Sequence, residues 1–172
     1  IYKKLKLIGA NVVISSDSKV ISTSDKIILP GVGHFKKAMD NLKNTGLIEV
    51  LNENVLEKYK PILGICLGMQ LMTSFSEEGN ENGLGWFDCK VSSFKVEDSL
   101  RYKIPHTGWN QIKIKKESRL MKNISENSEF YFVHSFHIKN EDVKDILNST
   151  QYEYRFTSAF EKDNIFGVQY HP

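Results

Sequence analysis

A cysteine lies between a strand-like run and a helical pattern in the first half of the sequence, and this arrangement narrows the folds that the chain can adopt. The segment Leu63–Gln70 reads L-G-I-C-L-G-M-Q, so glycines stand two residues before and two residues after Cys66. Uncharged apolar residues precede the cysteine, and apolar residues at helical spacing follow it. A strand that turns sharply into a helix at a nucleophile is the nucleophile-elbow arrangement, here with Cys in place of Ser. Gly64 and Gly68 would permit the tight turn and the close passage of strand and helix.

This elbow predicts a reactive thiol. A helix N-terminus lowers the pKa of a thiol below its usual value of about 8.5, which favours the nucleophilic thiolate. We therefore predict that Cys66 is a nucleophile. The alternative is an inert core residue, since free Cys is among the most buried residue types, but the flanking glycines favour the nucleophile. Cys89 has no such flanks and is predicted to be structural.

Strand-like and helical patterns alternate through the first half of the chain. Short β-branched or aliphatic runs that predict strands lie at Val12–Ile14, Ile27–Leu29 and Ile62–Ile65. Apolar residues at helical spacing, which predict helices, lie in Ile1–Ile8, Phe35–Tyr59 (with a break at Gly46) and Leu67–Phe75. The alternation predicts an α/β fold with a mostly parallel sheet flanked by helices. From Lys90 onward strand-like runs predict additional strands in the second half, at Gln111–Lys115, Glu129–Phe136 and Ile165–Tyr170.

Length and composition fit one globular domain and exclude several classes of protein. The chain has 172 residues, 40% hydrophobic and 26% charged, and no repeat or linker divides it, so residues 1–172 are predicted to form a single domain. A net charge of +2 gives no electrostatic case for nucleic acid, and no apolar run approaches the roughly 20 residues that span a bilayer. The two cysteines make no disulfide framework, which favours the cytoplasm. No cofactor fingerprint and no metal-ligand spacing occur, so no cofactor and no metal are predicted.

A glycine-rich turn, Pro30–Gly33, follows the strand-like run Ile27–Leu29. Such a turn can present backbone N–H groups to an oxyanion, and the N–H of Leu67, directly after the nucleophile, can supply another donor. On its own, a P-G-V-G turn more often only reverses the chain. It gains weight because it and Cys66 both follow the carboxyl ends of predicted parallel strands, where the active sites of α/β folds gather.

Five histidines compete for the role of general base. His134 and His137 lie three apart on a strand-like run, which predicts opposite faces and a poor metal pair. His171 follows the strand-like run Phe166–Tyr170 and therefore stands at the carboxyl end of a strand, as Cys66 does. A histidine in such a place is more often a surface residue, and the residues alone leave both interpretations open.

Three ordered motifs resemble the signatures of class I, triad-type glutamine amidotransferases. They are P-G-V-G at Pro30–Gly33, G-I-C-L-G-M-Q at Gly64–Gln70 and G-V-Q-Y-H-P at Gly167–Pro172. The resemblance implies a flavodoxin-like α/β fold and an enzyme that hydrolyses glutamine to glutamate and ammonia. It assigns Cys66 as the nucleophile and His171 as the acid–base residue of a Cys-His-Glu triad.

The same resemblance assigns binding roles around the nucleophile. Backbone groups of Leu67, Val32 and Gly33 are expected to bind the oxyanion, after the Val32–Gly33 turn reorients. The residues expected to hold the glutamine substrate are Gly31, Gln70, His134, Ser135 and Phe136. Together they would surround the side-chain amide of glutamine at the point where Cys66 attacks it.

Two further runs resemble the glutaminase subunits of imidazole glycerol phosphate synthases, from histidine biosynthesis. They are P-H-T-G-W-N at Pro105–Asn110 and Y-F-V-H-S-F at Tyr131–Phe136. This resemblance implies a heterodimer in which ammonia passes to a (β/α)8 barrel cyclase that forms imidazole glycerol phosphate and AICAR. The residues it places toward this partner are Trp109, Asn110 and Tyr131. A core position for Trp109 is an equal alternative, and His106 is expected to be structural or part of the interface.

The family pattern also predicts what lies beyond the two ends. Family members begin with a short strand and a glycine-rich loop ahead of the position of Ile1, and they continue H-P-E where this sequence stops at Pro172. We therefore expect a fragment that lacks the first strand and the Glu that would orient His171, with reduced activity and stability.

Three rival functions stand beside this interpretation. A paralogous amidotransferase that supplies ammonia for amidination of a surface-polysaccharide sugar would share nearly all these motifs, and the neighbouring barrel gene would separate the two. A γ-glutamyl hydrolase or another Cys-His peptidase acting alone is disfavoured by the Pro105–Asn110 run. A non-catalytic binding subunit is disfavoured by the presence of both Cys66 and His171.

Overall fold

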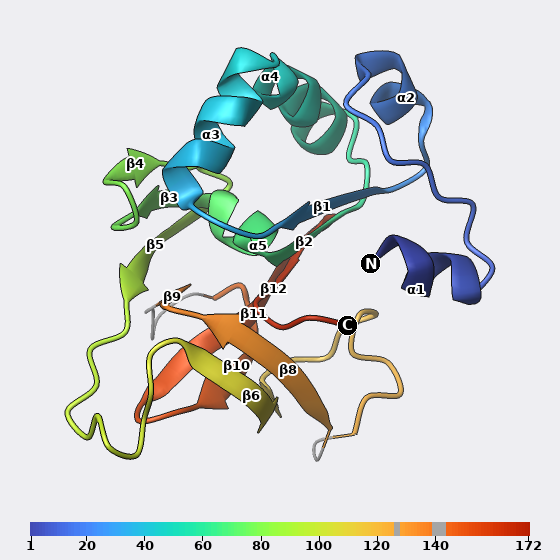
Figure 1. Ribbon diagram of the computed structural model, residues 1–172. Helices are drawn as coiled ribbons and strands as arrows, with labels where there is room; N and C mark the ends of the chain where they lie inside the picture. Colours follow the sequence, from blue (N-terminus) through green and yellow to red (C-terminus); the bar gives the residue numbers. More distant parts are fainter. Residues whose placement is uncertain (126–127, 139–143) are drawn as a thin grey trace.

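The computed structural model describes residues 1–125, 128–138 and 144–172 (Figure 1). Its helices are α1 (Tyr2–Leu7), α2 (Ser18–Thr23), α3 (Phe35–Asn44), α4 (Leu47–Asn52), the π-helical turn η1 (Glu53–Glu57) and α5 (Leu67–Leu71). Its strands are β1 (Ile27–Gly31), β2 (Ile62–Cys66), β3 (Thr73–Ser76), β4 (Glu81–Asn82), β5 (Phe87–Ser93), β6 (His106–Gln111), β7 (Lys113–Ile114), β8 (Glu129–His134), β9 (Phe136–Ile138), β10 (Ile146–Gln151), β11 (Arg155–Lys162) and β12 (Ile165–Val168). The predicted α/β fold with additional strands in the second half is confirmed. No helix in the described ranges is long and apolar enough to cross a membrane.

The main sheet is parallel where the candidate site lies and mixed elsewhere. Its strand order is β1-β2-β12-β11-β9-β5-β3-β4, with β10 and β7 continuing from β11. β2 pairs in parallel with β1 on one side and with β12 on the other, so that Gly31 lies opposite Cys66 and Val168 opposite Ile65. The carboxyl ends of these three strands therefore meet at one edge, as an α/β site requires.

Two hydrophobic clusters cover the two faces of β2. Ile62 belongs to a cluster with the apolar faces of α3, α4 and α5, whereas Ile65 belongs to a cluster with β8, β10, β11 and β12. Alternate residues of a strand point to opposite faces, which explains the division. In Figure 1 the helices α3 and α4 accordingly lie on one side of β1 and β2, and strands β6, β8 and β10 lie on the other.

A small second sheet consists of β6 and β8. The two strands pair antiparallel, with His106 opposite His134 and Trp109 opposite Tyr131. The backbone of His171 joins this sheet through an isolated bridge to Tyr131, in which the His171 N–H donates to the Tyr131 carbonyl at 2.9 Å. The chain segment after β12 therefore connects the parallel strand ends to the β6–β8 sheet.

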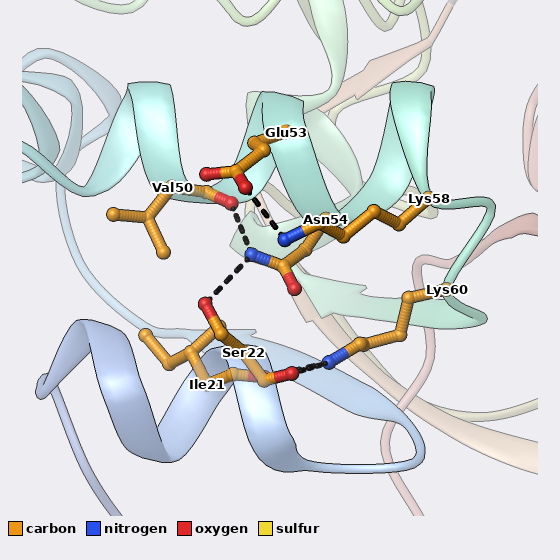
Figure 2. Close-up of polar contacts among 7 residues, drawn as sticks. All are labelled: Ile21, Ser22, Val50, Glu53, Asn54, Lys58 and Lys60. Atoms are coloured by element: carbon orange, nitrogen blue, oxygen red, sulfur yellow. Dashed lines mark hydrogen bonds and ion pairs between the residues drawn. The ribbon is translucent and has the colours of Figure 1, made fainter.

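Helix α2 is fastened to the helical layer by polar contacts (Figure 2). The fully buried Asn54 amide donates to the Val50 carbonyl at 2.8 Å and to the Ser22 hydroxyl at 3.2 Å. The Lys60 ammonium donates to the carbonyls of Ile21 and Ser22, at 2.8 and 2.9 Å. A cation on the last carbonyls of a helix satisfies acceptors that have no intrahelical partner, so Lys60 caps α2.

The predicted strand at Val12–Ile14 is wrong. This segment has no regular secondary structure, and Val13 and Ile14 are 67% and 80% exposed. A strand exists only through ladder hydrogen bonds to a neighbour. β1 forms the edge of the sheet in the described part of the chain, and it pairs with β2 alone.

The helix predicted over Leu67–Phe75 is correct only in its first half, because α5 ends at Leu71 and Phe75 lies in β3. The carbonyl of Leu71 accepts from the Leu84 N–H at 2.7 Å, and that of Met72 accepts from the Trp86 N–H at 3.0 Å. The loop between β4 and β5 thus occupies the backbone carbonyl groups that a longer α5 would have used. The other predicted elements are confirmed with different bounds: β1 and β2 extend past the predicted strands to Gly31 and Cys66, whereas the strand predicted over Glu129–Phe136 is divided between β8 and β9.

Candidate active site

Cys66 occupies a strained turn between β2 and α5. Its φ is 55° and its ψ is −111°, a backbone conformation that residues other than glycine rarely adopt. The residue is the last of β2 and the N-cap of α5, and only 8% of it is exposed. The predicted elbow is therefore present, and its backbone strain is of the kind that structures keep at functional sites.

The glycines around the elbow are required by backbone contacts. A Cβ on Gly68 would lie 1.7 Å from the Leu29 carbonyl oxygen, and one on Gly64 would lie 2.7 Å from the Gly68 carbonyl oxygen. A Cβ on Gly31 would lie 2.9 Å from the Cβ of Leu67. These distances are shorter than real contacts, so β1, β2 and α5 can meet at the nucleophile only because three small residues stand there.

The thiol of Cys66 is held mainly in its neutral form. Burial raises the pKa of Cys66, while hydrogen bonds from the Leu67 N–H and the Gln169 amide act in the lowering direction and the Glu78 carboxylate adds to the rise. The expectation of a lowered thiol pKa is therefore wrong, because desolvation outweighs the donors at the start of a five-residue helix. Burial raises the pKa of Cys89 further, to about 12. Cys66 needs a base that takes its proton as it reacts.

The predicted turn Pro30–Gly33 lies beside the nucleophile, but its first two residues belong to β1. Gly31 is paired with Cys66 across the β1–β2 ladder. The next two residues leave the sheet: Val32 is 84% exposed and Gly33 has a φ of 106°. The turn can therefore change conformation without disturbing the core.

Two glutamines form a buried network behind the nucleophile. The Gln169 amide nitrogen lies 3.6 Å from the Cys66 sulfur, and its oxygen accepts from the Gln70 amide at 2.9 Å. The Gln70 nitrogen also donates to the Phe136 carbonyl at 3.0 Å. The structure thus brings Gln70 into contact with the Phe136 backbone, and their role in holding glutamine stays a prediction. The carbonyl oxygen of Ser135, between β8 and β9, accepts a hydrogen bond from the Phe94 N–H at 3.0 Å.

Gln169 was not singled out by sequence reasoning. It is fully buried, and its contacts link Cys66 to Gln70. The signal available in the sequence was its place in G-V-Q-Y-H-P, one residue past the strand and two before His171. Only the pairing of β12 with β2 shows what this side chain touches.

His171 stands two residues beyond Gln169, at the same edge of the sheet. Its Nε2 is buried and makes no hydrogen bond within the described residues. Burial lowers the pKa of His171. No hydrogen bond joins the ring to Cys66 in the described part of the chain, so the structure shows a neutral imidazole but not a formed dyad.

A pair of buried histidines lies under the β6–β8 sheet. His134 Nε2 is 3.1 Å from His106 Nδ1, and His106 Nε2 is 3.3 Å from the Asn110 amide nitrogen. Burial lowers the pKa of His134 to about 3 and that of His106 to about 4, so both rings are neutral at pH 7. These values fit a structural role for His106. Asn110, which is predicted to lie toward the partner, is partly buried and contacts the His106 ring.

The prediction that His134 and His137 lie on opposite faces is wrong. The strand is interrupted at Ser135, between β8 and β9. Both rings pack against Phe94, with centroid distances of 5.2 Å for His134 and 4.1 Å for His137. The described residues contain no group of three or more His, Cys, Asp or Glu side chains placed to hold a metal ion.

The outer face of the β6–β8 sheet carries exposed apolar side chains. Trp109 is 69% exposed and Tyr131 is 36% exposed, and their rings meet edge to face at 5.8 Å. Val133 beside them is 42% exposed. Of the two alternatives for Trp109, the core position is therefore excluded. We call Trp109, Tyr131 and the adjacent Val133 the aromatic face.

Comparison with known proteins bears out the resemblance drawn from the motifs. The family model of class-I glutamine amidotransferases matches residues 2–172. A HisH 2 subunit of imidazole glycerol phosphate synthase from Methanococcus maripaludis is 52% identical over 165 residues, which cover 96% of this chain and 81% of that protein. One from Pseudomonas aeruginosa, also named HisH 2, is 45% identical over 168 residues and covers 98% and 82%.

Solved structures support the fold. A crystal structure of a glutamine amidotransferase superposes with a TM-score of 0.75 over 99% of this chain and 82% of that one, at 12% identity. The chain therefore belongs to the class-I glutamine amidotransferase family, in the branch that contains the HisH subunits of imidazole glycerol phosphate synthase.

Proposed function

We propose that residues 1–172 form one glutaminase domain in which Cys66 and His171 hydrolyse glutamine to glutamate and ammonia. The observation that carries this proposal is the strained, buried Cys66 at the elbow, where the ends of β1 and β12 flank it. Membership of the amidotransferase family supplies the substrate. Both cysteines are free, which supports a reducing compartment such as the cytoplasm.

The reaction follows from the protonation states. His171, neutral at pH 7, takes the thiol proton as the Cys66 sulfur attacks the side-chain amide carbon of glutamine. The resulting oxyanion receives hydrogen bonds from the Leu67 N–H and from the Val32–Gly33 turn. Collapse of this intermediate breaks the C–N bond, and His171 returns the proton to the leaving ammonia. Water then attacks the thioester, with His171 as base, and releases glutamate and the free thiol.

The partner in this proposal is a (β/α)8 barrel cyclase of histidine biosynthesis, which receives the ammonia. The aromatic face supports a docking role, because exposed Trp and Tyr side chains are enriched at protein interfaces. Asn110 lies on the same strand as Trp109. A docked partner would also keep ammonia from protonation and loss in water.

The isolated subunit should be nearly idle. The exposed Val32 and the left-handed Gly33 are not fixed by the core, so an oxyanion donor in this turn is not yet aimed. A missing oxyanion donor costs roughly 2.7–4 kcal/mol of transition-state stabilisation, or about 10²–10³ in turnover. Adding the barrel partner with its nucleotide ligand should restore that factor. Full activity of the subunit alone would instead favour a stand-alone hydrolase.

A labelling experiment tests the assignment of the nucleophile. A glutamine analogue that carries an electrophile in place of the amide should modify Cys66, and mass spectrometry of peptides locates the adduct. Cys89 provides the internal control, because it is equally buried but lies within β5. Modification of Cys89 with Cys66 untouched would refute the assignment.

A further inference from the structure

A continuous series of buried hydrogen bonds connects the nucleophile to the β6–β8 sheet. On one side it passes from the Cys66 sulfur to Gln169, then to Gln70, and reaches the Phe136 carbonyl oxygen. Gln169 is fully buried and Gln70 is 4% exposed, so water competes little for these groups.

The same carbonyl oxygen is approached from the other side by histidine. His134 Nδ1 lies 2.8 Å from the Phe136 oxygen, and its Nε2 contacts His106, which in turn contacts the Asn110 amide. Asn110 also donates to the Gln151 carbonyl at 2.9 Å. The Phe136 carbonyl is therefore held between Gln70 and His134.

The chemistry of that carbonyl fixes the direction of the bonds toward the nucleophile. A carbonyl oxygen can only accept, so Gln70 must turn its NH2 group toward Phe136. That nitrogen then donates its second proton to Gln169, which must present its oxygen. The NH2 group of Gln169 is consequently aimed at the Cys66 sulfur.

The histidines are fixed by the same rule. His134 must carry its proton on Nδ1 to donate to Phe136, which leaves Nε2 as an acceptor for His106 Nδ1–H. His106 Nε2 then accepts from the Asn110 amide. Every group along the series has one consistent role, and neither ring needs a charge.

We propose that Gln169 stabilises the Cys66 thiolate by donating from its amide, and that Gln70 and His134 are positioning residues which aim this donor by holding the Phe136 carbonyl. This inference rests on the proposed function in taking Cys66 as the nucleophile. A hydrogen bond to the charged form of an acid favours ionisation, and it opposes the effect of burial on this thiol. The Glu78 carboxylate, from outside the elbow, also acts on the Cys66 thiol and opposes its ionisation.

The test measures how the alkylation rate of Cys66 by iodoacetamide depends on pH, in the Cys89→Ala background so that one thiol reports. Gln169→Leu removes the donor, and Gln169→Glu keeps the size of the side chain while it replaces the donor by a carboxylate. A hydrogen bond to a charged group corresponds to roughly one to two pH units, so both variants should raise the midpoint by about that amount. At a given pH below the midpoint, alkylation slows about 10- to 100-fold.

An unchanged midpoint in folded Gln169→Glu would overturn the donor role. That result would say nothing against the hydrolysis of glutamine by Cys66, whereas hydrolysis by a Cys66→Ala variant would contradict the proposed function itself. The two failures are therefore distinguishable.

A second pair of variants tests whether His134 positions the Gln169 donor by holding the Phe136 carbonyl. His134→Leu removes the donor to the carbonyl, whereas His134→Asn places an amide nitrogen where Nδ1 was. The Leu variant should raise the alkylation midpoint, and the Asn variant should bring it back toward that of the parent. Equal midpoints in both variants, whether shifted or not, would contradict the positioning role of His134.

Discussion

The elbow and the β6–β8 sheet are built in opposite ways. At the elbow, backbones approach so closely that a Cβ on Gly68 would lie 1.7 Å from the Leu29 oxygen. In the β6–β8 sheet, contacts are made by large rings: His106 stacks on Phe132 at 4.9 Å and Trp109 meets Tyr131 at 5.8 Å. One region is fixed by its backbone and the other by its side chains.

The two kinds of packing determine which region can respond to a partner. A backbone packed on a backbone has no room to adjust, so the nucleophile keeps its position whether or not anything binds. The β6–β8 sheet presents Trp109 at 69% exposure on one face and buries His134 at 6% on the other. It can therefore contact a partner outside while touching the polar network inside.

The largest effect should come from the nucleophile itself. Cys66→Ala, assayed for glutamine hydrolysis with the partner present, should lose activity by roughly 10⁴-fold or more, because no other group replaces the sulfur. Cys89→Ala is the matched control: it removes a thiol of equal burial from β5 and should retain hydrolysis. Comparable losses in both variants would show that burial, not the elbow, explains the effect.

The second prediction compares the stability that is lost when a methyl group is added at the elbow and in the β6–β8 sheet. Gly68→Ala must push β1 away from α5 and should lower the free energy of unfolding by several kcal/mol, on the order of the largest core substitutions. Gly108→Ala, in β6, meets nothing within 4 Å and suffers only the strain of its φ of 137°, about 1–2 kcal/mol. Urea unfolding of both variants gives the comparison. If Gly108→Ala proves the more damaging, the two regions do not differ as described.

Much of the elbow could be predicted from the sequence because its requirements are local. Gly64, Cys66 and Gly68 stand within five consecutive residues, and each follows from the sharp turn between β2 and α5. β1 and β2 could be predicted for the same reason, because each is a short run of apolar residues that is visible in the local sequence. The prediction failed for Val12–Ile14, whose strand character needs a neighbour that the segment itself does not specify.

The network behind the nucleophile could not be predicted, because it joins residues that are distant in sequence. Gln169 reaches Cys66 across 103 positions and Gln70 across 99, and both contacts exist only because β12 inserts beside β2. The sign of the Cys66 pKa shift was missed for the same reason. Burial by a cluster drawn from several strands outweighs the helix start that the sequence displays.

The third prediction concerns the aromatic face. Trp109→Ala should weaken binding of the barrel partner about 10- to 100-fold, since exposed tryptophans at interfaces commonly contribute 1–3 kcal/mol. Titration calorimetry with the purified partner measures the dissociation constant. Tyr2→Ala, which removes an aromatic residue that is 43% exposed from α1, is the control and should bind as the parent does. Unchanged affinity for Trp109→Ala would place the interface elsewhere.

The smallest effect should appear as a difference in acid sensitivity between the two regions. The folded-state pKa values of His134 and His106, about 3 and about 4, lie below the ordinary value of 6.5. The unfolded chain therefore binds more protons as the pH falls below 6.5, so stability is present above that pH and is lost toward the folded-state values. Between pH 7 and pH 5.5 this amounts to roughly 1 kcal/mol per histidine. The raised pKa of Cys66 acts only at alkaline pH, so the elbow contributes nothing in this window.

Urea unfolding at several pH values isolates this contribution when the parent is compared with His134→Asn. The variant keeps a donor toward the Phe136 carbonyl but has no ring to protonate, so its free energy of unfolding should fall less steeply between pH 7 and pH 5.5. His34→Asn is the matched control, because the His34 ring lies at the exposed start of α3 and should leave the slope as in the parent. Parallel slopes in the parent and His134→Asn would mean that His134 is not held neutral by burial. The fixed direction of hydrogen bonds from His134 to Phe136 would then fail as well, since a doubly protonated ring could not accept from His106.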